Sequence, residues 1–180
     1  MKRKLVLVVL VAALLLGTPL TASADVRLDF DVPWLIAAGL NLSNFFGSGS
    51  VSVDLSSLHI PLPYAMLAYQ FGDSFLRGGI GIRTYPLIIE FVGWPMAYAE
   101  VELDRLVLRA ELGGFGIFFV GALVNTLLVQ DITITDVQLG YAFFPWLRVG
   151  AGILVGAPLS NVSNNIWAFY INARFTFDFK

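Results

Sequence analysis

The only histidine of the chain, His59, follows Ser56 and Ser57 and lies five residues after Asp54. These residue types can perform nucleophilic acyl transfer, in which a histidine takes the proton of a serine hydroxyl. That chemistry needs the base and the nucleophile within hydrogen-bond reach, and nothing in this spacing fixes their geometry. We therefore expect a solvated loop rather than a catalytic site, and no enzyme activity.

Groups that could hold a metal or a cofactor are scarce. The chain has no cysteine and one histidine, so no metal-ligand cluster is available and we expect neither a metal nor a cofactor. Two glycine groups, Gly78-Gly79-x-Gly81 and Gly150-x-Gly152, fall inside expected strands, whereas a dinucleotide fingerprint joins a strand to a helix. We expect these glycines to permit strand curvature and close packing.

The remaining polar residues alternate with apolar ones, which is the period of a β-strand. In the segment 167–179 the odd positions are apolar, while the even ones include Asn172, Arg174 and Asp178. This segment is long enough to cross a membrane as a strand, which takes about 9–11 residues. Further strands are predicted near 26–32, 64–71, 76–83, 99–103, 106–112, 136–143 and 147–153.

The connections between these eight segments are predicted to alternate in length. Tight turns are expected at 72–74, 104–105 and 145–146, and longer links near 39–60, 91–96, 119–131 and 158–165. Short turns at one end and longer loops at the other are typical of an up-and-down membrane barrel. We therefore predict an all-β, eight-stranded antiparallel barrel in which the first and last strands pair, because closure leaves no unpaired edge in lipid.

The composition excludes several functions. Of the 180 residues 57% are hydrophobic and only 13% charged, and the formal net charge is −2. Average soluble proteins have roughly 25% charged residues. The hydrophobicity excludes intrinsic disorder, and the absence of a basic excess argues against nucleic-acid binding.

The N-terminal segment predicts export. Basic residues at 2–4 precede the apolar run 5–16, and Ala22-Ser23-Ala24 has the pattern of a cleavage site. We expect residues 1–24 to be a signal peptide and residues 25–180 to form the barrel. Without the signal the chain has eight basic and 13 acidic residues, a net charge of −5.

The export signal, the eight amphipathic segments and the aromatic last strand resemble the small outer-membrane β-barrels of the OmpA, OmpX and OmpW type. In those proteins the last strand carries an assembly signal with a terminal aromatic residue, which Phe175, Phe177 and Phe179 match, although Lys180 follows. The resemblance implies a location in the bacterial outer membrane. It also implies contact with outer-membrane lipids and the barrel-assembly machinery.

Three alternatives stay open at this stage. The segment 112–129 is apolar enough for a helix, which would make the chain a helical membrane protein. A soluble, exported, lipocalin-like lipid carrier would also show amphipathic strands. Some outer-membrane barrels modify lipids with histidine, serine and an acid near the outer leaflet, and His59 gives weak support to that class.

The polar parity places 13 charged residues inside the barrel, mostly in the half with the short turns. They are Arg27, Asp29, Asp31, Arg77, Arg83, Glu100, Glu102, Arg109, Glu111, Asp136, Arg148, Arg174 and Asp178. Unpaired charges in a narrow lumen are costly, so the nearly equal numbers of arginines and acids predict a paired network. An eight-stranded barrel is just wide enough to be filled by side chains, so we expect a polar plug rather than an open pore.

The same parity makes the lumen apolar toward the longer loops. The predicted inward residues there are Leu35, Tyr85, Leu87, Ile89, Met96, Tyr98, Phe115, Ile117, Phe119, Leu154 and Tyr170. Such a cup either holds a small hydrophobic ligand or is filled by its own side chains. The sequence thus predicts a barrel that is structural, or that binds or conducts small hydrophobic molecules.

The four tryptophans are predicted to mark the membrane interfaces. Trp34, Trp94 and Trp167 fall near strand ends on the loop side, and Trp146 falls near a short turn. Rings at both interfaces form the aromatic girdles of membrane barrels.

Overall fold

The structure is a computed structural model that describes residues 25–43, 50–54, 61–86, 90–121, 127–129, 131–160 and 164–179. All regular structure in these residues is β-strand. The long strands are β1 (Asp25–Ser43), β3 (Tyr64–Gly72), β4 (Leu76–Pro86), β5 (Glu90–Leu103), β6 (Leu106–Gly114), β9 (Ile132–Phe144), β10 (Leu147–Pro158) and β11 (Asn165–Phe179). Three short strands, β2 (Ser50–Asp54), β7 (Ile117–Gly121) and β8 (Leu127–Val129), extend this set.

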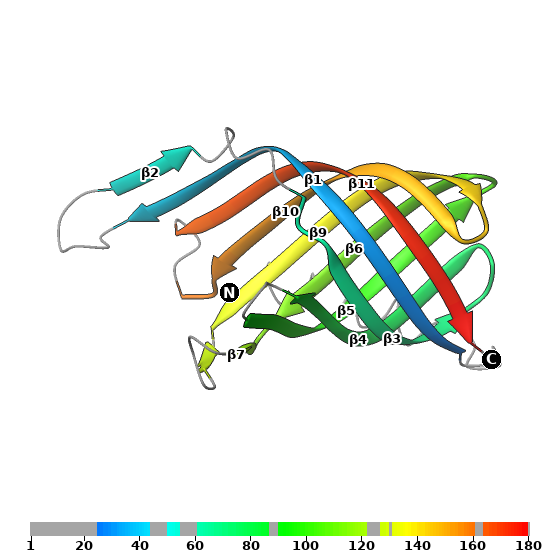
Figure 1. The fold of residues 1–180 in the computed structure, drawn as a ribbon, viewed down its shortest axis with the longest axis horizontal. Coiled ribbons are helices and arrows are strands. Elements are labelled where there is room, and N and C mark those ends of the chain that lie inside the picture. The colour runs from blue at the N-terminus through cyan, green and yellow to red at the C-terminus, as the bar shows by residue number, and fades with distance from the viewer. Residues whose placement is uncertain are drawn as a thin grey trace, which may run out of the picture.

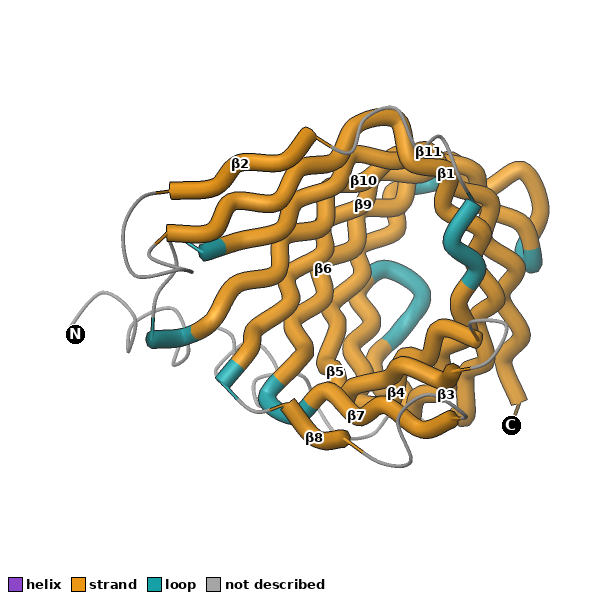
Figure 2. Tube along the Cα trace, turned by 60° about the vertical axis from the view of Figure 1, so that its left-hand side comes forward, coloured by secondary structure: helices purple, strands orange, loops and turns teal. Residues whose placement is uncertain are grey.

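The eight long strands form a closed antiparallel ring (Figures 1 and 2). Each pairs with the next long strand along the chain, and β1 pairs with β11 from Val26↔Phe179 to Asn41↔Asn165. The predicted eight-stranded barrel is therefore confirmed. At the loop end β1 continues beyond its pairing with β3 and forms a projecting hairpin with β2 (Figure 1).

The short turns lie at one end of the barrel, near the described ends of the chain. Turns at 73–75, 104–105 and 145–146 join β3 to β4, β5 to β6 and β9 to β10, as predicted. A predicted longer link at 91–96 is wrong, because these residues are part of β5. The sequence Gly93-Trp94-Pro95 resembles a break. However, Pro95, which has no N–H, lies where β5 passes from pairing with β7 to pairing with β6, so no ladder bond is lost there.

The strand pairing changes sharply after β6. Gly114 and Phe115 both have positive φ, 96° and 53°, and a Cβ at Gly114 would lie 2.2 Å from the carbonyl oxygen of Ile132. The chain there leaves β9, and β7 pairs with β5 and β8 instead. The helical alternative for 112–129 is wrong, since its described residues form strands, with a bend at 115–116.

None of the residues that the structure describes forms a helix long and apolar enough to cross a membrane.

Alternation places polar groups inside the barrel and apolar groups outside. In β3, Met66, Ala68 and Gln70 are buried in the lumen, whereas Leu67 and Tyr69 are more than half exposed on the outer face. The same pattern repeats around the ring and leaves large apolar side chains exposed on all eight long strands. The buried charged and polar residues thus lie inside, next to an apolar cluster, while the exterior is apolar, which is the reverse of the surface of a soluble domain.

Candidate functional site: the charged lumen

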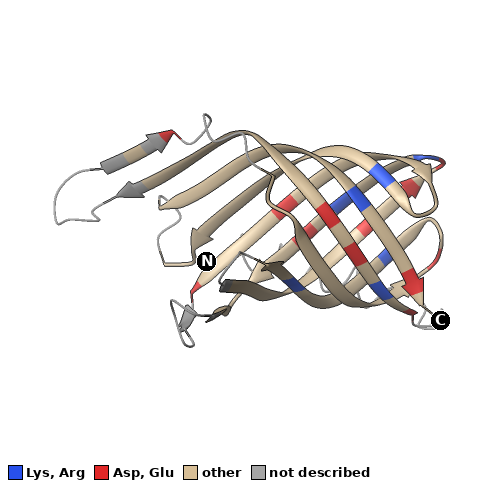
Figure 3. Ribbon diagram, viewed as in Figure 1, with Lys and Arg blue, Asp and Glu red and all other residues tan. Residues whose placement is uncertain are grey.

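All eight long strands contribute polar side chains to the lumen, and the charged ones gather in the half that contains the short turns (Figure 3). The structure buries ten of the 13 predicted charges: Arg27, Asp29, Asp31, Arg83, Glu100, Arg109, Glu111, Asp136, Arg148 and Arg174. Arg77 and Glu102 lie at the mouth, with side chains 18% and 22% exposed. Asp178, next to the end of β11, is exposed, but it accepts a hydrogen bond from Gln70, whose side chain is buried in the lumen.

Glu100 of β5 is the centre of the network. Its carboxylate lies within ion-pair distance of five guanidinium groups: Arg27 at 3.1 Å, Arg109 at 3.5 Å, Arg77 and Arg148 at 3.6 Å, and Arg174 at 3.9 Å. Arg27 donates to both carboxylate oxygens, at 3.1 and 3.2 Å, which is the bidentate geometry that favours arginine over lysine. One carboxylate therefore connects β1, β4, β5, β6, β10 and β11 across the lumen.

A second group of ion pairs lies next to Glu100. Arg109 contacts Asp29 and Glu111, each at 2.7 Å, although the approach to Glu111 has the geometry of an ion pair and not of a hydrogen bond. Asp31 accepts hydrogen bonds from Arg174, from the Tyr64 hydroxyl and from Asn172. The buried network and its mouth contain six arginines and six acids, so the charges balance.

Arg83 separates the ionic half of the lumen from the apolar half. Its guanidinium pairs with Glu111 at 2.9 Å and Asp136 at 2.6 Å. The same group lies 3.6 Å from the centroid of the Tyr64 ring, and the rings of Tyr85 and Trp94 lie at 5.4 and 5.8 Å. Arginine can satisfy both sides because it is planar and stacks on aromatic faces while it binds carboxylates.

Several neutral partners in this network were missed by reasoning from charge alone. Tyr64, Gln70, Gln138, Asn172 and Thr176 all bind charged groups in the lumen. Gln138, Asn172 and Thr176 have the same parity as the charged residues of their own strands. Tyr64 and Gln70, on a strand without charges, share the inward parity of Met66 and Ala68. Parity was therefore the signal that could have identified them.

The predicted apolar part of the lumen is only partly as expected. Met96, Tyr98, Ile117 and Tyr170 are buried, and Tyr85, Phe119 and Leu154 pack against the buried cluster. Leu35 is half-buried, while Leu87 and Ile89 lie outside the described residues. The prediction for Phe115 is wrong: its side chain is 56% exposed, because the left-handed backbone at 114–115 turns it out of the lumen.

The tryptophans divide between the two faces. Trp34 and Trp146 are nearly half exposed on the outer face, and Trp167 is half-buried over Gly39. The prediction that Trp94 belongs to an outer girdle is wrong, since it is 7% exposed and stacks on Tyr85 in the lumen. At the short-turn end Trp146 stacks between Phe144 and Phe175 on the outside, and the neighbouring Phe177 and Phe179 are exposed.

The residues considered for acyl transfer are not assembled by the described part of the chain. Asp54 ends β2 in the projecting hairpin, whereas Ser56, Ser57 and His59 lie outside the described residues, as does the predicted signal peptide 1–24. Among the described residues no group of three or more histidines, cysteines or acids could hold a metal ion.

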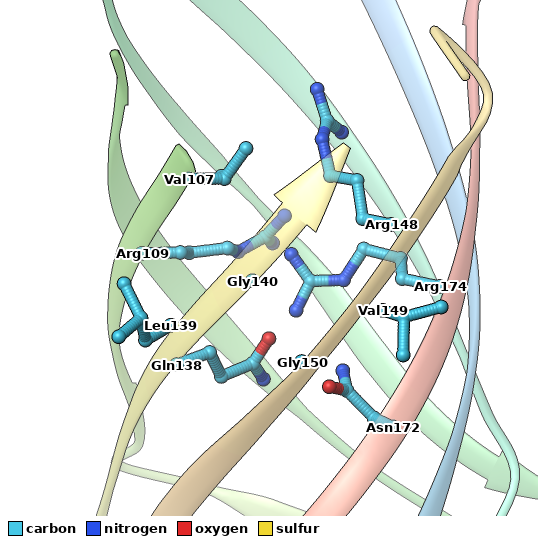
Figure 4. A pocket seen from close by; sticks show the side chains of 10 residues that line it. All are labelled: Val107, Arg109, Gln138, Leu139, Gly140, Arg148, Val149, Gly150, Asn172 and Arg174. Carbon is cyan, nitrogen blue, oxygen red and sulfur yellow. The ribbon is translucent and has the colours of Figure 1, made fainter. Parts of the chain in front are cut away.

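A small cavity lies in the wall of the charged half (Figure 4). Its volume is about 20 Å³. Side chains of Arg109, Gln138, Arg148, Asn172 and Arg174 line it, and Gly140 and Gly150 form part of its floor. A cavity of that size has room for about one water molecule or a small ion.

Neither a family model nor a curated protein matches the chain. Among solved structures, Neisserial surface protein A has 15% identity and a TM-score of 0.46, and the match covers 84% of this chain and 97% of that one. Ail of Yersinia pestis has 8% identity and a TM-score of 0.33, with 87% and 99% covered. The KdgM porin has 12% identity and a TM-score of 0.31, with 84% and 99% covered.

The fold class follows from the structure of the chain itself. Eight antiparallel strands close into a ring through the β1–β11 pair, with apolar side chains outside and ion pairs inside. Only closed barrels and helices satisfy every backbone group in lipid. The chain has the fold of the small eight-stranded outer-membrane β-barrels.

Proposed function

We propose that the protein is a structural barrel of the bacterial outer membrane whose lumen is closed to ions. The outer surface supports the membrane location. Leu67, Ile80, Leu108 and Leu139, on four different strands, are each more than half exposed, and such a continuous apolar surface is unfavourable in water. Exposed aromatic rings at the short-turn end match an interfacial girdle.

The observation that carries the closed lumen is the set of ion pairs around Glu100. These pairs join strands on opposite sides of the ring, and the side chains of Arg27 and Glu100 are fully buried between them. A water-filled pore would need a continuous path past these groups. The cavity of about 20 Å³ beside them is far smaller than such a path.

Bilayer recording of the full protein, refolded into detergent and reconstituted, tests the closed lumen. We expect no stable conductance steps at voltages at which a general porin in the same lipid gives them. Stable ohmic steps in the wild-type protein would contradict the proposal. Membrane fractionation, together with the gel shift that folded barrels show on heating, tests the location, and protein found soluble in the periplasm would contradict it.

A second candidate is the binding of a small apolar molecule at the loop end. Beyond Arg83 the lumen is lined by Trp94, Ile117, Ile134 and neighbouring apolar side chains. Fluorescence of Trp94 in a Trp34→Phe, Trp146→Phe, Trp167→Phe background would report occupation of this region. A saturable emission shift with a medium-chain fatty acid supports this function, and no shift with any apolar compound contradicts it.

A further inference from the structure

The cavity in the charged half exists because two glycines face each other across neighbouring strands. Gly140 of β9 is paired in register with Gly150 of β10, and both have the inward parity of Gln138 and Arg148. Residues other than glycine at these two positions would each place a side chain in the lumen. The absence of side chains leaves the space that the surrounding arginines border (Figure 4).

The lining of this cavity carries positive charge only. Arg109, Arg148 and Arg174 border it together with the amides of Gln138 and Asn172, and no carboxylate is among the described residues that line it. The guanidinium groups of Arg109 and Arg174 point toward one another across the space (Figure 4). Each of these two groups also pairs with a carboxylate, Arg109 with Asp29 and Arg174 with Asp31, but on the side of the cavity they present only positive charge to each other, and an anion between them would be attracted to both.

Three buried donors of the lining arginines have no hydrogen-bond partner, and one of them, Nε of Arg109, still forms an ion pair with Glu111. Nη2 of Arg174 and Nε of Arg148 are unpaired, and the two side chains are only 4% and 6% exposed. By contrast, the amide nitrogens of Gln138 and Asn172 already donate to Asp136 and Asp31. A buried charged donor without a partner is costly, so such groups normally bind an ordered water molecule or an ion.

We propose that this cavity is a binding site for one small monovalent anion of the size of chloride. The volume of about 20 Å³ is enough for one group close to water in size, which favours a small monovalent anion over a larger one. A water molecule could also accept the unpaired hydrogen bonds, but it carries no charge to interact with the three guanidinium groups that border the cavity, although Arg109 and Arg174 also pair with Asp29 and Asp31 outside it. The anion adds a negative charge inside the cavity, where none of the described lining residues is a carboxylate.

Crystals of the full protein grown in bromide provide a direct test, because bromide replaces chloride and scatters anomalously. We expect an anomalous peak between Arg109 and Arg174. Density in the cavity without an anomalous signal would show water there and would overturn the proposal. An empty cavity would overturn it as well.

Unfolding in urea gives a second readout, with sodium chloride compared with sodium gluconate at equal ionic strength. A ligand that binds only the folded state multiplies the ratio of folded to unfolded protein by a factor. This factor is one plus the ratio of the ligand concentration to its dissociation constant. At chloride ten times above that constant the ratio rises about elevenfold. The effect should saturate, whereas a bulk salt effect continues to increase.

The Gly140→Ala variant separates binding from general salt effects. A Cβ at Gly140 would lie 3.5 Å from the carbonyl oxygen of Val149 and 3.9 Å from the Cα of Gly150, so the methyl group fits and reduces the cavity. We expect this variant to fold and to lose the saturable chloride effect. Ala151→Gly, on the outer face of the adjacent strand, is the matched control and should keep it. An unchanged chloride effect in Gly140→Ala would overturn the proposal.

Discussion

Replacing Glu100 with glutamine removes the central negative charge of the lumen while keeping its shape. Five guanidinium groups lie 3.1–3.9 Å from this carboxylate. At an effective dielectric constant of about 20, each contact corresponds to a gross attraction of about 4–5 kcal/mol. These attractions cannot be added to give a contribution to the free energy of unfolding, because they are offset by the cost of removing the charges from water. Breaking a buried pair on one side typically costs about 3–5 kcal/mol, and we expect a loss of this size for Glu100→Gln.

The assay is reversible urea unfolding of the full protein in micelles, followed by tryptophan fluorescence and by the gel shift of unheated samples. Glu102→Gln is the matched control, since Glu102 lies two residues along β5 on the same face and pairs with Arg77 at 2.7 Å and Arg148 at 3.2 Å. Its side chain is 22% exposed, and solvent screening should limit its effect to about 1 kcal/mol or less. Equal effects of the two substitutions would refute the central role of Glu100, as would a stabilised Glu100→Gln.

Three further expectations concern other parts of the barrel. Brominated lipids should quench Trp146, which is 46% exposed on the outer face, but not Trp94 in the lumen; quenching of both in single-tryptophan variants would contradict the fold. Arg83→Lys should lower the free energy of unfolding in urea by about 1–3 kcal/mol, because lysine keeps the charge but loses the planar stack on the Tyr64 ring at 3.6 Å. An unchanged free energy of unfolding would show that the stack contributes nothing. The backbone amide of Leu76 and that of the preceding residue lower the pKa of Asp73 in the first short turn. A carboxyl whose pKa is lowered by folding stabilises the folded state at pH values above its ordinary pKa. The free energy of unfolding of Asp73→Asn should therefore be lower than that of the wild-type protein at pH 7, and this difference should vanish as the pH falls through the pKa of Asp73 in the folded state. A difference that does not depend on pH would contradict this.

Parity along each strand was sufficient to predict the barrel and its inward charges, because the side-chain period of a strand is two wherever the ladder is regular. It failed where the ladder is irregular. Phe115 follows Gly114, and the positive φ of both residues rotates the phenyl ring to the outside. A register shift between Leu35 and Ala37 likewise exchanges the inward and outward positions of β1 near the loop end. The composition of that segment does not predict this shift.

Trp94 shows the opposite case, in which the signal was present. It shares the parity of Met96, Tyr98 and Glu100, all of which are buried in the lumen. Its placement in an outer girdle followed from its nearness to an expected strand end, which the structure moves to Glu90. When a strand extends through a Gly-Trp-Pro sequence, parity is a better guide than position.

Which arginine pairs with which acid could not be predicted from sequence, since it depends on strand tilt and register around the whole ring. Arg27 and Glu100 are 73 residues apart and on strands that are not neighbours, yet they form a bidentate pair. Arg109 similarly contacts Asp29, Glu100 and Glu111 from three different strands. A lysine at this position would present one compact charge without the planar fork of donors. The use of arginine at every cationic position of the lumen network therefore follows from a geometric requirement: each cation must bind carboxylates that approach from several walls of a barrel only eight strands wide.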